Sequence, residues 1–88
     1  MKLRIRDLRE DNDLYQRNIA EYLGVKQQTY SRYEVGELEP NLRVLAKLAA
    51  FYKTSVDFLI GITDVKEPYP KPAEEVNLDE VGIVSKED

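Results

Sequence analysis

The chain has 88 residues, of which 42% are hydrophobic, so it can enclose one modest core and leaves no room for a separate catalytic domain. Cysteine and histidine are both absent, which excludes disulfides, zinc fingers and nearly all nucleophilic or imidazole chemistry. A net charge of −4 argues at first against nucleic acid as a partner. We therefore expect a protein that is not an enzyme and that needs neither a metal nor a cofactor.

The charge is unevenly divided along the chain. Residues 1–61 carry ten Lys or Arg against nine Asp or Glu, whereas residues 62–88 carry three against eight. The first part is thus +1 and the second −5, which together give the net −4. The acidic excess lies in the second part, so the first part remains compatible with DNA binding, at an affinity that depends on salt.

Targeting and membrane segments are not expected. The first residues contain no apolar run long enough for a signal peptide, and no window approaches the roughly 20 apolar residues of a membrane span. We expect a cytoplasmic, soluble protein without a membrane partner.

Apolar periodicity in the first 61 residues predicts an all-α fold, with no competing strand pattern. Five helices are expected, over residues 2–11, 16–23, 27–35, 41–52 and 56–60. Their apolar faces repeat at three- and four-residue spacing and should form one small core. The residues expected to face inward are Ile5, Leu8, Ile19, Ala20, Leu23, Leu42, Leu45, Leu48, Ala49 and Tyr52. Ser55 is the expected cap of the last helix, and Gly61 its expected end.

The stretch over residues 16–36 combines two short helices, a glycine turn and a polar helix face. Gly24 supplies the positive φ that ends the first of these helices. Steps of 100° along the second place Gln27, Gln28, Ser31 and Arg32 on one outward arc and Thr29, Tyr30 and Tyr33 on the other side. From such an exposed face in the major groove, a glutamine amide can accept a hydrogen bond from the N6 amino group of adenine and donate one to N7. The pattern therefore favours recognition of duplex DNA, although any exposed helix also has a polar side.

The same stretch and the helix that follows it resemble the Cro/C1-repressor helix-turn-helix family, also called the XRE type, over about residues 3–61. The residues that carry the resemblance are Leu14, Gln16, Ile19, Ala20, Leu23, Gly24, Val25, Ser31, Tyr33, Glu34, Gly36, Pro40, Leu45, Ala49, Val56, Asp57 and Leu59. The resemblance implies a five-helix, lambda-repressor-like fold whose second motif helix enters the major groove. It also implies a structural role for Glu34, and dimers that bind two half-sites.

Eight residues are candidates for DNA contacts. The resemblance implies contacts from Gln16, Gln27, Gln28 and Arg32, and the position of the others beside this face adds Arg17, Lys26, Ser31 and Asn41. Asn41 could bring a phosphate to the start of its helix or simply cap that helix. The surface cations could equally be solvated charges.

Four features depart from the family pattern, and one of them is Val35, which replaces a usual polar residue. Tyr15 stands where a Ser or Thr cap usually precedes the helix, so Asp13 supplies the cap or the cap is missing. Tyr30 replaces a usual Ile or Val, and its hydroxyl must reach water or a partner if the ring is buried. Glu37 and Glu39 lie in a loop that often carries basic residues, so these charges should weaken binding.

Beyond residue 61 the composition changes to an extended acidic tail. Pro68, Pro70 and Pro72 impose an extended spacer, and acidic residues with a few apolar ones follow. The predicted organisation is a DNA-binding domain over residues 1–61 and a tail over residues 62–88 that serves dimerisation or binds a partner.

The pattern as a whole predicts a repressor of transcription that binds a pseudo-palindromic operator in double-stranded DNA as a homodimer. The alternative is an antitoxin or another interaction module whose acidic tail binds a basic protein partner.

Overall fold

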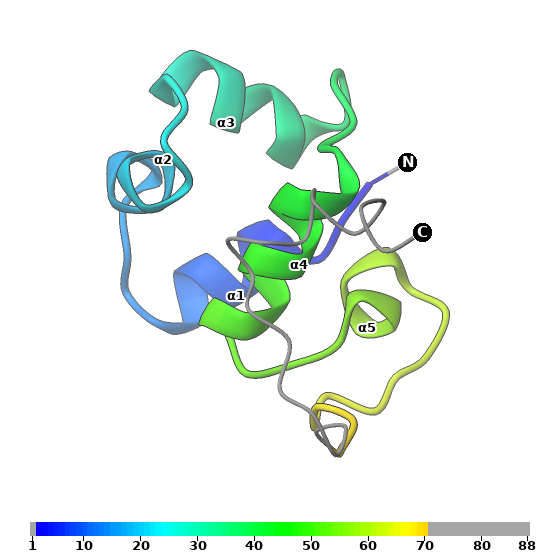
Figure 1. Cartoon of the computed structure of the whole chain (residues 1–88). Coiled ribbons are helices and arrows are strands. Elements are labelled where there is room, and N and C mark those ends of the chain that lie inside the picture. The colour runs from blue at the N-terminus through cyan, green and yellow to red at the C-terminus, as the bar shows by residue number, and fades with distance from the viewer. Residues whose placement is uncertain (1, 71–88) are drawn as a thin grey trace, which may run out of the picture.

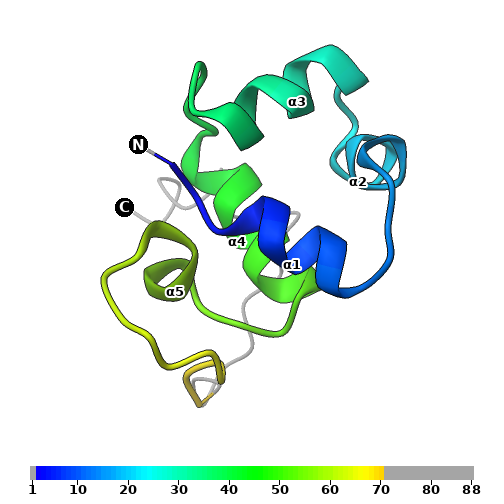
Figure 2. The same cartoon turned by 180° about the vertical axis from the view of Figure 1, so that it is seen from behind.

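The computed structural model describes residues 2–70, and within this range the fold is all-α. Its five helices are α1 (Ile5–Asp11), α2 (Gln16–Leu23), α3 (Gln27–Val35), α4 (Leu42–Phe51) and α5 (Val56–Ile60). In views from both sides, α1 and α4 lie between α2 and α5, and α3 forms an outer edge of the molecule (Figures 1 and 2). Pro72 and the rest of the predicted tail, residues 71–88, lie outside the described residues.

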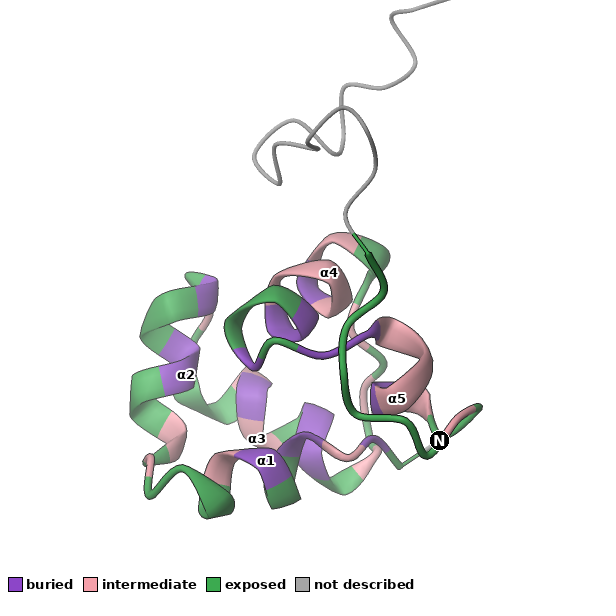
Figure 3. Cartoon of the chain, turned by 90° about the horizontal axis from the view of Figure 1, so that it is seen from below, coloured by how far each residue is buried: buried purple, intermediate pink, exposed green. Residues whose placement is uncertain are grey.

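One core joins the inner faces of all five helices. Thirteen hydrophobic residues are buried in it, namely Leu3, Ile5, Leu8, Ile19, Ala20, Leu23, Tyr30, Tyr33, Val44, Leu48, Ala49, Tyr52 and Leu59. Figure 3 marks the buried positions along the ribbon of the helices. The prediction for Leu42 was wrong, because this side chain is 69% exposed and Val44 takes the buried place in the first turn of α4. Leu45 is only half-buried.

Three helices end in the same way, at a glycine. Gly24, Gly36 and Gly61 have φ of 75°, 83° and 88°, the left-handed region that glycine enters without a steric penalty. At each glycine, the N–H of the next residue donates to the carbonyl oxygen five residues back, which closes a Schellman motif. The ends predicted at Gly24 and Gly61 are therefore confirmed.

The helix starts are capped in different ways. The Ser55 hydroxyl accepts the Phe58 N–H at 3.0 Å, which confirms the predicted cap of α5. At α2 the expected alternatives were Asp13 or no cap, but Asn18 reaches back instead, and its Oδ1 accepts the Tyr15 N–H at 2.8 Å. This bond satisfies the same backbone group as the second half of a capping box.

The first helix starts later than predicted because a long-range contact holds the residues before it. The Arg4 N–H donates to the carbonyl oxygen of Leu59 at 3.0 Å. Leu3 is buried in the core although it precedes the helix. The segment before the helix thus packs against α5, and α1 begins at Ile5 rather than at Lys2.

The chain beyond α5 stays in contact with the helices. The Arg4 guanidinium donates to the Thr63 carbonyl oxygen at 3.0 Å and pairs with Asp64 at 2.8 Å. The Thr54 hydroxyl donates to the Lys66 carbonyl oxygen at 2.6 Å. Residues 63–66 are therefore held against the segment before α1 and the loop between α4 and α5.

Candidate nucleic-acid interface

The outward face of α3 carries the polar arc that the sequence predicts. Gln27, Gln28 and Arg32 are exposed, whereas Tyr30 and Tyr33 on the opposite side are buried. A shallow, open hollow runs along this face, lined by Lys26, Gln28, Thr29, Ser31 and Arg32. The structure thus brings four of the eight candidate residues together. It adds Thr29, which the helical projection placed on the inner side and which is half-buried at the edge of the arc.

The cations beside this face are held by neighbouring side chains. The Arg17 guanidinium carbon lies 4.7 Å from the centre of the Tyr15 ring, in cation–π geometry. Arg32 pairs with Glu37, with 3.5 Å between Nε and Oε1. The Tyr15 ring, which replaces a small capping residue, therefore orients Arg17 instead of capping α2.

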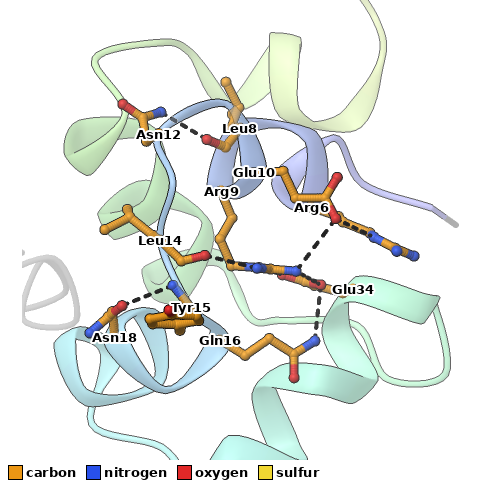
Figure 4. Close-up of polar contacts among 10 residues, drawn as sticks. All are labelled: Arg6, Leu8, Arg9, Glu10, Asn12, Leu14, Tyr15, Gln16, Asn18 and Glu34. Atoms are coloured by element: carbon orange, nitrogen blue, oxygen red, sulfur yellow. Dashed lines mark hydrogen bonds and ion pairs between the residues drawn. The ribbon is translucent and has the colours of Figure 1, made fainter.

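A buried ion pair fixes α3 against the first two helices (Figure 4). Glu34 is 2% exposed, and its carboxylate accepts hydrogen bonds from Arg9 Nε at 2.7 Å and Arg9 Nη2 at 3.2 Å. Arg9 Nη1 also donates to the Leu14 carbonyl oxygen at 2.9 Å. The structural role that the resemblance implied for Glu34 thus has a physical basis, since a charge buried this deeply needs a paired partner.

Gln16 belongs to the same network. Its Nε2 donates to Glu34 Oε1 at 3.1 Å, so the side chain is anchored to α3 and uses one of its two amide hydrogens there. We call the three residues Arg9, Gln16 and Glu34 the buried network. Its partners come from α1, α2 and α3, and it sets how α2 meets the helix that carries the polar arc.

The electrostatics of this network favour an ionised carboxylate. Burial alone would raise the pKa of Glu34, but hydrogen bonds from Arg9 and Gln16 and the nearby Tyr30 hydroxyl outweigh it and hold the pKa below its ordinary value. Burial and then the Glu34 carboxylate raise the pKa of Tyr30, and burial raises that of Tyr52 to about 12. The buried Tyr30 hydroxyl interacts with the Glu34 carboxylate electrostatically, and within the described residues it makes no hydrogen bond of standard geometry.

Asn41 caps α4. Its Oδ1 accepts the Val44 N–H at 2.9 Å, and its side chain is exposed at the start of a helix other than α3. The structural half of the expectation for Asn41 is therefore met, while Asn41 does not line the hollow on α3.

Comparison with known proteins identifies the family. A family profile described as helix-turn-helix matches residues 5–59, which is more than half of the chain. The chain belongs to the Cro/C1-type helix-turn-helix family. Members of this family are DNA-binding proteins and not enzymes.

Several curated relatives share this region. The uncharacterized HTH-type transcriptional regulator YobD of Bacillus subtilis is 39% identical to this chain over 77 residues. The match covers 88% of this chain and 66% of YobD. The cryptic phage CTXphi transcriptional repressor RstR of Vibrio cholerae is 42% identical over 58 residues, 66% of this chain and 52% of its own. The HTH-type transcriptional regulator AnsR of B. subtilis is 34% identical over 71 residues, which cover 81% of this chain and 61% of AnsR. The chain thus spans between about half and two thirds of these relatives.

A solved structure supports the fold. The crystal structure of a transcriptional regulator from Listeria innocua aligns with 99% of this chain and 78% of its own, with a TM-score of 0.63 and 23% identity. At 23% identity, this similarity shows a shared fold and nothing more.

Residues 2–70 include no helix that is long and apolar enough to cross a membrane. This part of the chain also brings together no group of three or more Asp or Glu side chains that could hold a metal ion.

Proposed function

We propose that this protein is a cytoplasmic repressor of transcription that binds a pseudo-palindromic operator in double-stranded DNA as a homodimer. The outward face of α3 lies in the major groove, and Gln27, Gln28 and Arg32 contact base edges. The centres of the two half-sites are then about 34 Å apart, or a multiple of that distance.

The observation that carries this proposal is the exposed polar face of α3 on a rigidly held helix. The two tyrosines opposite this face are buried, the Gly24 turn fixes the preceding helix, and Glu34 ties α3 to α1 and α2. A helix whose backbone position is fixed in this way can present amide groups to a base edge with the precision that hydrogen-bond recognition needs.

The remaining candidates take supporting roles in the proposal. Lys26 and Arg17 contact phosphates on either side of the groove, and Ser31 permits close approach of α3 or donates to a phosphate. Gln16 contacts a phosphate with its second amide hydrogen, and Asn41 contacts one at the start of α4. These contacts position the protein, whereas the glutamines and Arg32 supply the sequence preference.

The first test is selection of bound sites from a random duplex library at about 0.15 M salt, where screening limits purely electrostatic binding. Enrichment of an inverted repeat supports a dimeric DNA-binding protein. Failure to enrich any sequence with folded protein would overturn the proposal and favour a module that binds a protein partner through its acidic tail. Sedimentation analysis of the protein alone and with one operator tests the homodimer, since a 1:1 complex with a full inverted repeat contradicts it.

A further inference from the structure

The end of α3 brings an acidic residue back onto the proposed DNA-contacting face. The Gly36 N–H donates to the Tyr33 carbonyl oxygen at 3.4 Å, and the Glu37 N–H donates to that of Arg32 at 3.0 Å. These two bonds define the Schellman motif, in which the residue after the glycine folds back over the residue five positions earlier. The backbone therefore places Glu37 beside Arg32, independently of their side-chain conformations.

An ion pair stands where this motif usually has an apolar contact. At the end of α2 the corresponding residues are Val25 and Ala20, both apolar. At the end of α3 they are Glu37 and Arg32, and Glu37 Oε1 lies 3.5 Å from Arg32 Nε. The two glycine turns are alike in backbone geometry and differ in this side-chain pair.

The atoms in this pair matter for what Arg32 can bind. The shortest contact of the carboxylate is with Nε, which lies on the stem side of the guanidinium. Two terminal nitrogens in one plane are the donors that contact O6 and N7 of guanine together. Arg32 side-chain exposure is 54% and that of Glu37 is 66%, so the pair lies at the surface where DNA would approach.

We propose that Glu37 is a specificity-determining residue that acts through Arg32. Glu37 orients the guanidinium toward a guanine edge, and its negative charge opposes the contact that Arg32 would otherwise make with any nearby phosphate. Glu37 thus lowers the affinity for random DNA more than the affinity for the operator. This inference rests on the function proposed above and names the base that Arg32 prefers.

The size of the effect follows from counterion release. Each additional phosphate contact steepens the dependence of log affinity on log salt by about 0.9, which at about 0.15 M salt corresponds to roughly fivefold in affinity. Glu37→Gln keeps the shape of the side chain and removes its charge. We expect this variant to bind random DNA about fivefold more tightly, with a salt slope steeper by about 0.9, and to gain nothing on the operator.

The matched control is Glu39→Gln, which makes the same charge change in the same exposed loop but outside the Schellman motif. Site selection with the parent protein comes first and supplies the operator. Affinities for operator and random duplex are then measured by fluorescence anisotropy across a salt series for the parent, both single variants, and Glu37→Gln in an Arg32→Ala background. We expect the operator-to-random ratio to fall for Glu37→Gln alone, and selection with this variant to lose its guanine preference at one position.

The outcomes separate the two proposals. If no operator is selected, the proposed function fails and this inference fails with it. If an operator is selected but both single variants change the ratio equally, or Glu37→Gln acts as strongly without Arg32, the inference is overturned and the function stands. A ratio lowered only by Glu37→Gln and only with Arg32 present supports the role of Glu37.

Discussion

Replacement of Arg9 by methionine tests whether the buried network holds the fold together. Methionine keeps most of the apolar stem and removes the guanidinium, so three hydrogen bonds are lost, two to Glu34 and one to the Leu14 carbonyl oxygen. The Glu34 side chain, 2% exposed, then retains its charge with only Gln16 as a donor. Breaking a buried pair in this way costs about 3 to 5 kcal/mol, a large share of the roughly 5 to 15 kcal/mol by which a domain is stable.

The cost should depend on pH. In the parent protein the pKa of Glu34 is lowered below 4.5, so its stabilising contribution is complete above that value and is lost as pH falls through the folded-state pKa. Without Arg9, the largest influence that opposes burial is lost, so we expect the Glu34 pKa to rise above its unfolded value. The carboxylate of the variant then destabilises the fold at neutral pH, and this penalty disappears on protonation. The difference between parent and variant should therefore be largest near neutral pH and smaller in acid.

Urea unfolding followed by circular dichroism at about pH 7 and about pH 4 measures both effects. The control is Arg9→Met/Glu34→Leu, which removes both charges and should recover most of the loss, because apolar replacement of a complete buried pair is often nearly neutral. A loss under about 1 kcal/mol at neutral pH, or an equal loss at both pH values, would refute the assignment of a buried, ionised Glu34.

Three further predictions concern the proposed interface. Gln28→Ala should weaken operator binding by about 1 to 3 kcal/mol and relax the preference at one adenine in site selection; equal losses on operator and random DNA would contradict a base contact. Arg17→Ala should weaken binding to all sequences alike and reduce the salt slope by about 1 in a titration series, whereas a loss confined to the operator would point to a base contact. Asn41→Ala should lower the free energy of unfolding by about 1 kcal/mol through loss of the α4 cap, and an added loss of DNA affinity beyond that of Asn41→Ser would reveal a phosphate contact.

Much of the fold could be predicted because local chemistry sets its helix ends. The predicted ranges of α2, α3 and α5 match the structure, since Gly24, Gly36 and Gly61 stop these helices through backbone geometry that belongs to the glycines themselves. The start of α1 was wrong for the opposite reason. The sequence pattern extended the helix to Lys2, but the bond from Arg4 to Leu59 joins parts of the chain far apart in sequence and holds the residues before Ile5 against α5.

In the candidate site, too, the features set by local sequence could be predicted and those set by long-range contacts could not. Periodicity located the outward arc of α3, because helix geometry alone decides which residues lie on the same face. Periodicity did not identify Arg9, whose charged side chain is typical of a solvated surface but packs against Glu34 in a helix 25 residues away. The resemblance to the family supplied the role of Glu34 without its partner. Nothing local to either residue signals the pair, so only the arrangement of helices reveals it.

The two ion pairs on α3 also explain how this short helix can be both fixed and selective. Glu34 pairs with Arg9 on the inner side, where low exposure makes the interaction strong and costly to break. Two residues before it, Arg32 pairs with Glu37 on the outer side, where both groups are solvated and the interaction is weak. A weak outer pair leaves Arg32 able to contact a base edge beside Glu37, whereas a strong inner pair keeps the helix in place during that contact. An Arg–Glu pair therefore holds the helix in place where it is buried and leaves the arginine able to contact DNA where it is exposed.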